Sequence, residues 1–219
     1  MAAKSDSFVW RLENPHVVGG HSTEVLGEPM SREDVGGRAI FFDGVDDGLF
    51  VPVNPLAGAT AFTVEILFKP DSAGPAEQRF FHLQDERGNR ALLETRMIEG
   101  RWALDTFLSS VDSKQKRILL DRTKTHPADR WTWVALVYRD GHLTHYIDGV
   151  KELDGAVEFP PLAAGRFSLG VRQNKVYWFK GGLREVRFQR TAVPAEDLQR
   201  VRRETPPPTA DAATAALRH

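Results

Sequence analysis

Residues 77–96, EQRFFHLQDERGNRALLETR, form two stretches of alternating side chains around a central turn. Gly88 and Asn89 stand next to charged residues at that turn, which is typical of a short hairpin connection. Side chains alternate between the two faces of a strand, so the polar residues are predicted to gather on definite faces. The alternation places Arg79, Phe81 and Leu83 on one face and Phe80, His82 and Gln84 on the other, and in the partner strand Leu92, Glu94 and Arg96 opposite Leu93, Thr95 and Met97.

The same pattern recurs along the chain, where short alternating stretches are separated by turns such as Asp140-Gly141 and Asp148-Gly149. About ten short strands with turns between them indicate an all-β, two-sheet antiparallel sandwich. Residues 192–204, AVPAEDLQRVRRE, are the exception. A proline and acidic residues near the start and arginines near the end predict one short C-terminal helix there.

The division of the chain follows from composition. At 219 residues and 41% hydrophobic content, one sizeable core is expected. Residues 1–37 carry spaced turn signals and are predicted to form an extended arm or strands that pack on the domain of residues 38–204. Residues 205–219 are rich in proline and alanine, and we expect a disordered tail.

Charge and residue usage exclude several functions. The chain has 29 Lys and Arg against 30 Asp and Glu, a balance that argues against nucleic-acid binding, and it has no cysteine for thiolate chemistry. No apolar run approaches the ~18 residues of a membrane span, and no signal peptide is visible. We therefore expect a cytoplasmic protein with no nucleic-acid or membrane partner.

Three segments carry a family resemblance: residues 39–71, 131–152 and 167–198. They begin AIFFDGVDDGLF, WTWVALVYRDGH and FSLGVRQNKVYW, respectively. In this order they resemble the concanavalin A-like lectin/glucanase superfamily, in particular its laminin-G-like jelly-roll domains. The resemblance covers roughly residues 38–200 and implies two antiparallel sheets, one of them concave, with ligands on the concave face or its rim. The fold serves lectins, adhesion modules, glycoside hydrolases and polysaccharide lyases, so it does not by itself fix a function.

In a sandwich, one face of each strand packs into the core and the other points outward. Four consecutive strands between residues 62 and 108 carry outward polar side chains, and we expect these to meet in one groove on the concave sheet. His82 ordinarily titrates near neutrality and is the first choice for proton transfer, and paired carboxylates serve glycoside hydrolysis. The predicted catalytic residues are His82, Glu94, Asp105 and Glu65. The predicted substrate-binding residues are Arg79, Gln84, Arg96, Arg172 and Asn174, with Trp178 as a platform for sugar stacking.

The predicted ligand is a carbohydrate or another small molecule. If the protein is an enzyme, it is expected to be a glycoside hydrolase or a uronate lyase without an organic cofactor. Jelly-roll alginate lyases carry Arg-x-Glu and Gln-Ile-His motifs, whereas this chain has Glu94-Thr95-Arg96 and His82-Leu83-Gln84, with both orders reversed. The alternatives are a lectin-like or protein-interaction module without catalysis, or an enzyme acting on a small non-sugar metabolite. Ion pairs on a solvated strand face would also explain the charges.

Asp43, Asp46 and Asp47 crowd one turn. Calcium prefers several carboxylate and carbonyl oxygens, and related jelly rolls often hold a structural calcium near this turn, so the resemblance implies such a site here. The alternative is that Asp and Gly are present only because they favour turns.

Overall fold

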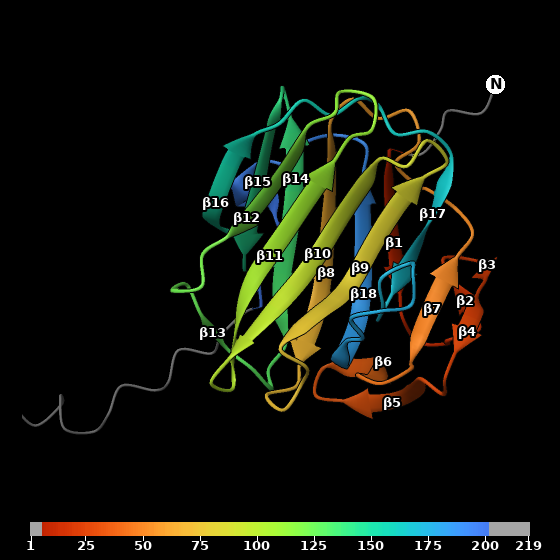
Figure 1. The fold of residues 1–219 in the computed structure, drawn as a ribbon. Coiled ribbons are helices and arrows are strands. Elements are labelled where there is room, and N and C mark those ends of the chain that lie inside the picture. Colours follow the sequence, from red (N-terminus) through yellow and green to blue (C-terminus); the bar gives the residue numbers. More distant parts are fainter. Residues whose placement is uncertain (1–5, 202–219) are drawn as a thin grey trace, which may run out of the picture.

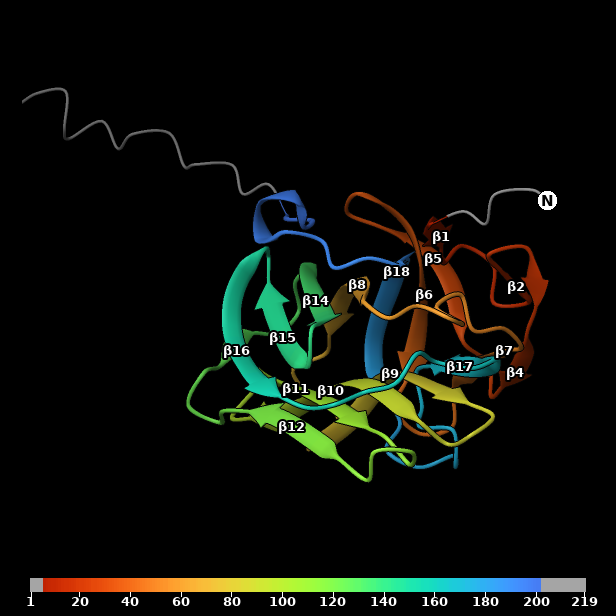
Figure 2. The same cartoon turned by 90° about the horizontal axis from the view of Figure 1, so that it is seen from above.

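The computed structural model describes residues 6–201 and consists of two large antiparallel sheets packed face to face (Figures 1 and 2). The front sheet has the strand order β12-β11-β10-β9-β17-β7-β4, with β13 paired to β11. The back sheet has the order β16-β15-β14-β8-β18-β6-β5, with β1 paired to β18. The prediction of an all-β, two-sheet sandwich is confirmed.

The strands of the front sheet are β4 (Glu24–Leu26), β7 (Gly48–Val51), β9 (Glu77–Asp85), β10 (Arg90–Ile98), β11 (Arg101–Ser109), β12 (Lys116–Leu120), β13 (His126–Pro127) and β17 (Gly165–Leu169). Those of the back sheet are β1 (Ser7–Arg11), β5 (Met30–Asp34), β6 (Gly37–Asp43), β8 (Phe62–Pro70), β14 (Thr132–Arg139), β15 (His142–Ile147), β16 (Val150–Ala156) and β18 (Lys180–Gln189). A separate pair is formed by β2 (Val17–Val18) and β3 (His21–Ser22).

The core lies between the two sheets and is rich in aromatic rings. Phe68 of β8 stacks on Phe80 of β9 at 4.6 Å between ring centroids, and Trp102 of β11 meets Phe68 edge-on at 4.8 Å. All three side chains are fully buried. Burial of each such side chain contributes about 1.5–3 kcal/mol or more, so these contacts across the sandwich fix the two sheets against each other.

The hairpin between β10 and β11 sets the register of the polar residues. Its two-residue turn, Glu99-Gly100, has positive φ angles of 49° and 73°. Turns of this kind match the right-handed twist of the strands, and glycine adopts such a φ without strain. The resulting register places Glu94 directly opposite Asp105.

The pairing of β9 with β10 contains a bulge that the alternation of the sequence did not predict. Leu93 pairs with Phe81 and Glu94 with Arg79, so Phe80 is an extra residue in β9. Phe80 and Phe81 are both fully buried. The prediction that Arg79 shares a face with Phe81 is therefore wrong, because a bulge shifts the alternation by one residue. Arg79 instead lies on the outer face with Glu94.

The predicted C-terminal helix is only a single turn in the described part of the chain, the 3₁₀ helix η1 (Ala195–Asp197). Leu198 then adopts an extended conformation and packs with Val193 on the outer face of the back sheet. The backbone N–H of Gln199 donates to Glu65 Oε1 at 2.7 Å. The apolar contacts of Leu198 and the hydrogen bond from Gln199 to Glu65 hold the segment against the sheet in an extended conformation. These contacts take the place of the hydrogen bonds of a longer helix. Residues 202–204 of the predicted helix and the predicted tail lie outside the described residues.

Residues 6–37 contain short strands that join both large sheets. β1 pairs with β18, β5 pairs with β6, and β4 pairs with β7. Between residues 6 and 201 there is no helix long and apolar enough to cross a membrane.

Candidate functional site

The outer face of the front sheet carries two adjoining hollows over β9, β10 and β11, the strands nearest the viewer in Figure 1. We call the first, of about 170 Å³, the carboxylate hollow, and the second, of about 350 Å³, the arginine hollow. Arg172 lines both, so the two hollows meet at this side chain. The carboxylate hollow is lined by Arg79, Leu92, Glu94, Arg96, Asp105, Phe107, Ile118 and Arg172, and the arginine hollow by His82, Gln84, Arg90, Arg166, Arg172, Gln173 and Asn174.

The floor of the carboxylate hollow is a network of buried ion pairs. Arg96 Nη2 lies 3.1 Å from Glu94 Oε2 and 2.6 Å from Asp105 Oδ2. Arg79 Nε lies 3.0 Å from Glu94 Oε2, and its Nη1 lies 3.1 Å from Glu77 Oε2. Arg79, Glu94, Arg96 and Asp105 are each less than 10% exposed. Charged side chains this deeply buried need oppositely charged partners to offset the loss of hydration.

The pKa of Asp105 in this network is strongly raised. Burial, followed by the negative charge of Glu94, raises the pKa of Asp105 to about 7, although Arg96 opposes both. Asp105 Oδ1 is buried and has no hydrogen-bond partner among residues 6–201. Near neutral pH this carboxyl group therefore exists in both protonation states, and one of its oxygens is left without a hydrogen-bond partner in the described chain.

His82 lines the arginine hollow and is 2% exposed. Its Nδ1 accepts a hydrogen bond from the backbone N–H of Gln173 at 3.1 Å, so the proton of the neutral ring lies on Nε2. Burial, followed by the positive charge of Arg172, lowers the pKa of His82 to about 3. The expectation that His82 titrates near neutrality is corrected by this environment. His82 offers an N–H donor instead, because Nε2 is buried with no partner in the described chain.

The loop between β17 and β18 completes the site. Gln173 Nε2 donates to the carbonyl oxygens of His82 and Arg166, at 3.1 and 3.0 Å, which fastens the loop to the sheet. Tyr177 covers the Arg79 guanidinium, whose carbon lies 3.7 Å from the ring centroid. The loop thus brings Arg172 over the junction of the two hollows.

Eight of the ten predicted catalytic and substrate-binding residues meet on this face. These are His82, Glu94, Asp105, Arg79, Gln84, Arg96, Arg172 and Asn174. Sequence reasoning missed Arg90, Arg166, Gln173 and Tyr177. For Arg90 and Arg166 a signal was present, because each alternates with buried apolar residues and so points outward from its strand.

Glu65 does not join the other predicted catalytic residues. It lies on β8 in the back sheet, because the chain crosses to the front sheet between Pro70 and Glu77. Burial raises the pKa of Glu65, and its Oε1 accepts the Gln199 N–H. Trp178 lines neither hollow, and its ring packs against Gly48 of β7 instead.

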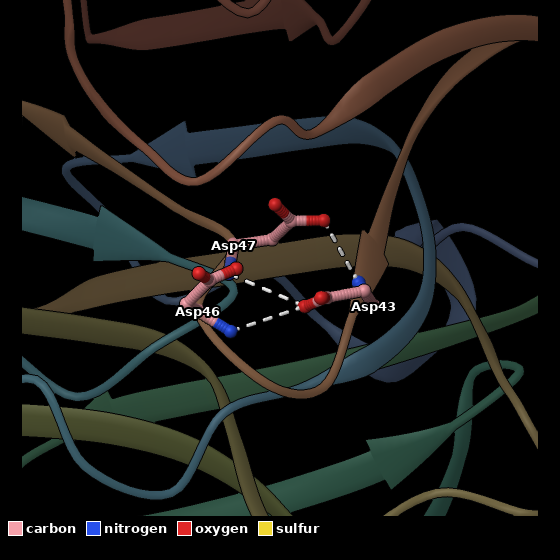
Figure 3. A group of neighbouring side chains, drawn as sticks. All are labelled: Asp43, Asp46 and Asp47. Atoms are coloured by element: carbon pink, nitrogen blue, oxygen red, sulfur yellow. Dashed lines mark hydrogen bonds between the residues drawn. The ribbon is translucent and has the colours of Figure 1, made fainter.

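The three predicted metal ligands lie together at the turn after β6 (Figure 3). One carboxylate oxygen from each of Asp43, Asp46 and Asp47 lies within 4.8 Å of the others. Asp43 Oδ1 accepts the backbone N–H groups of Asp46 and Asp47, at 3.2 and 3.3 Å, and Asp47 Oδ2 accepts that of Asp43 at 3.0 Å. Burial and the neighbouring carboxylates raise the pKa of Asp47.

A Cβ placed on Gly27 would lie 2.4 Å from Asp47 Oδ1, 2.8 Å from Asp46 Oδ1 and 2.9 Å from the Asp46 carbonyl oxygen. The absence of a side chain at Gly27 thus leaves a notch lined by oxygen atoms, which are the ligands that calcium prefers. These oxygen atoms suit a calcium ion by type, and Asp47 Oδ1 also accepts the backbone N–H of Glu28 at 2.7 Å.

A second polar cluster connects the two sheets away from the hollows. Glu152 of β16 contacts His126 Nε2 at 2.7 Å and His145 Nε2 at 3.5 Å. His145 Nδ1 and the Thr106 hydroxyl of β11 lie 3.0 Å apart. The histidine partners lower the pKa of Glu152 to about 2, although its burial acts in the opposite direction.

Comparisons with known proteins agree with this architecture. Domain 4 of AbnA, a GH43 extracellular arabinanase from Geobacillus stearothermophilus in complex with arabinotriose, is 19% identical with a TM-score of 0.63, and the match covers 88% of this chain and 97% of that one. The binding domain of botulinum neurotoxin DC in complex with SialylT is 10% identical with a TM-score of 0.63, over 89% of this chain and 50% of that one. The binding domain of Paraclostridial Mosquitocidal Protein 1 is 12% identical with a TM-score of 0.63, over 87% and 50%.

At these identities the likeness shows the fold alone, and the chain spans half the length of the two toxin binding domains. A comparison with curated proteins finds no match. A family model of the concanavalin A-like lectin/glucanases superfamily matches residues 43–199. This is the superfamily that the three segments resemble. The chain belongs to the concanavalin A-like lectin/glucanases superfamily.

Proposed function

We propose that this protein binds an oligosaccharide on the outer face of the front sheet, across the carboxylate and arginine hollows. The observation that carries the proposal is a pair of unsatisfied polar atoms in the two adjoining hollows. His82 Nε2 is a buried donor and Asp105 Oδ1 a buried acceptor, each without a partner among residues 6–201. Buried polar groups are nearly always hydrogen-bonded, so a ligand with donors and acceptors, such as the hydroxyl groups of a sugar, would satisfy both.

The apolar side chains of the site suit the same ligand. Phe107 is half-buried in the carboxylate hollow, and Tyr177 is 42% exposed beside it over Arg79. Aromatic faces pack against the C–H groups of a sugar ring without requiring hydrogen bonds there. The arabinotriose-bound arabinanase domain and the toxin binding domain in complex with SialylT are structural neighbours whose ligands lend support to a carbohydrate.

The proposal is tested by isothermal titration calorimetry with a panel of neutral and acidic oligosaccharides. Phe107→Ala is expected to weaken the binding of any bound saccharide by about tenfold, because it removes the stacking surface. Tyr146→Ala is the matched control, because Tyr146 is a partly buried aromatic residue on the outer face of the back sheet. Absence of binding across the panel, or binding that Phe107→Ala leaves unchanged, would contradict the proposal.

A second candidate function is acid–base catalysis on the bound saccharide, either glycoside hydrolysis or β-elimination from a uronate. The observation that favours it is the Asp105–Glu94 pair, in which the pKa of Asp105 is raised to about 7. A carboxylic acid whose pKa is raised toward neutrality, with a second carboxyl group close by, is what such acid–base chemistry uses. His82, with its pKa lowered to about 3, would be a weak base near neutral pH.

Catalysis is tested by following the release of reducing ends and the ultraviolet absorbance of unsaturated uronates with each saccharide that binds. Asp105→Asn should abolish turnover while the saccharide still binds. If a bound saccharide is never turned over, the protein is a binding module without catalysis.

We further propose that calcium binds at the turn of Asp43, Asp46 and Asp47. The cluster of three carboxylates supports this proposal, and so does the notch where Gly27 faces the Asp46 and Asp47 carboxylates and the Asp46 carbonyl oxygen. The ion would offset the mutual repulsion of these carboxylates and so stabilise the turn between β6 and β7.

A further inference from the structure

We infer that the arginine hollow binds the acidic group of a charged saccharide, so that the natural ligand is an acidic rather than a neutral oligosaccharide. This inference rests on the proposed function, because it names the ligand class of the same site. The acidic group is a carboxylate or a sulfate, both of which present anionic oxygens to the same donors.

The charged side chains that line this hollow are all positive. Arg90, Arg166 and Arg172 line it, and no carboxylate does. None of the ion pairs within residues 6–201 includes any of the three arginines. Arg166 Nε donates to Gln173 Oε1 at 3.2 Å, and the guanidinium carbons of Arg90 and Arg166 lie 5.7 and 4.9 Å from the ring centroids of Phe107 and Phe50. None of these contacts neutralises a positive charge, and guanidinium groups match the geometry of carboxylate and sulfate oxygens.

The fourth donor is His82 Nε2, at the floor of the same hollow. The ring is 2% exposed, and its other nitrogen is occupied by the Gln173 N–H. Nε2–H is left without a partner in the described chain. A buried N–H beside three guanidinium groups is a donor that an anionic oxygen would satisfy better than a neutral hydroxyl group.

The arginines also repel one another. Arg172 lowers the pKa of Arg90, in addition to burial, and the charges of both arginines contribute to the low pKa of His82. A bound anion would relieve this repulsion, so its binding should raise the pKa of His82 by linkage. This shift provides a readout that a merely structural role for the arginines would not give.

The two adjoining hollows suggest how the ligand lies. In the carboxylate hollow, Arg79 and Arg96 are already paired with Glu94 and Asp105, so this hollow offers an anionic group less unpaired positive charge than the arginine hollow does. The acidic group is therefore expected over Arg90 and Arg166, and the neighbouring sugar ring over Phe107, with Arg172 between them.

The test is calorimetry with three pairs of probes that differ only or mainly in charge. These are trigalacturonate and its methyl ester, 3′-sialyllactose and its methyl ester, and a sulfated trisaccharide and its desulfated form. At least one charged member should bind tenfold or more tightly than its neutral counterpart, and the pair that responds separates carboxylate from sulfate. Arg172→Gln and Arg90→Gln should each remove most of this preference. Arg139→Gln, which changes a 70% exposed side chain on the back sheet, should have no effect.

An NMR titration of the His82 ring with and without the preferred probe provides the second readout, and the pKa of His82 should rise on binding. The inference is overturned, while the proposed function stands, if neutral saccharides bind as tightly as charged ones and the arginine substitutions change nothing. If none of the six probes binds, the proposed function fails as well.

Discussion

Glu94 and Asp105 face each other across β10 and β11, and both contact the same atom, Nη2 of Arg96. A single guanidinium nitrogen thus stabilises two buried carboxyl groups. Arg79 shares its charge between Glu94 and the more exposed Glu77. The network has three carboxyl groups for two guanidinium groups, and a proton on Asp105 restores the balance.

The first prediction concerns the protonation of this pair. Carbon-13 NMR titration of the Asp105 carboxyl group should give a pKa of about 7, against an ordinary value of 3.8. Glu94→Gln should lower this pKa, because the Glu94 charge is one of the causes of the shift, and Arg96→Met should raise it. A value near 4 in the wild-type protein would contradict the buried network described above.

The same shift predicts how stability depends on pH. Because the folded protein binds the Asp105 proton more tightly than the unfolded chain does, the contribution of this group to stability is present below pH 3.8 and lost as pH rises to about 7. Urea unfolding at a series of pH values should show this loss in the wild type. In the Asp105→Asn variant, the free energy of unfolding should decrease less steeply between pH 3.8 and about 7.

The second prediction concerns Arg96 itself. Arg96→Met keeps most of the side-chain volume and removes the charge that Glu94 and Asp105 share. Because it leaves two buried carboxyl groups without this partner, it should lower the free energy of unfolding by about 3–5 kcal/mol. Adding Glu94→Gln and Asp105→Asn to Arg96→Met should recover much of the loss. Urea denaturation measures both effects, and a single variant as stable as the wild type would refute the structural role of Arg96.

Much of this site was predictable because β10 and β11 are regular. Strict alternation and a two-residue turn are enough to place Glu94, Arg96 and Asp105 on one outer face. The position of Arg79 was not predictable in the same way, because the extra residue Phe80 is a local irregularity that apolar patterning does not reveal.

The remaining differences from the sequence-based predictions arise from topology. Glu65 alternates as clearly as Glu94 does, but no local signal tells which sheet β8 joins. Gln173 and Tyr177 belong to a loop whose path is set by tertiary contacts with His82 and Arg79. Alternation therefore predicts the faces of the strands, whereas strand order and loops decide which faces meet.

The third prediction concerns the cluster between the sheets. The pKa of Glu152 is lowered to about 2 from 4.5, so its contribution to stability is present above pH 4.5 and is lost as pH falls toward 2. Glu152→Gln should reduce the stability measured at pH 6 and flatten the decline between pH 4.5 and 2. The exposed Glu158→Gln, two residues beyond β16, is the control and should leave this decline unchanged.

The fourth prediction tests the calcium proposal. Calcium should raise the melting temperature of the wild-type protein and EDTA should reverse the rise, because a ligand that binds only the folded state stabilises it. Gly27→Ala should abolish the effect, since its Cβ would lie 2.4 Å from Asp47 Oδ1. Gly20→Ala is the matched control, because Gly20 also has a positive φ but has no atom within 4 Å of the added Cβ. Equal calcium responses in both variants would rule out this notch as the site.

The most direct test of the central claim is to map saccharide binding on the protein by NMR chemical-shift perturbation, with trigalacturonate and 3′-sialyllactose as probes. We predict that the perturbed amides will cluster on β9, β10 and β11 and on the loop of Arg172 and Gln173, and that β14–β16 of the back sheet will be unaffected. Perturbations centred on the back sheet or on the Asp43 turn, or none with either probe, would contradict the assignment of this face as the binding site.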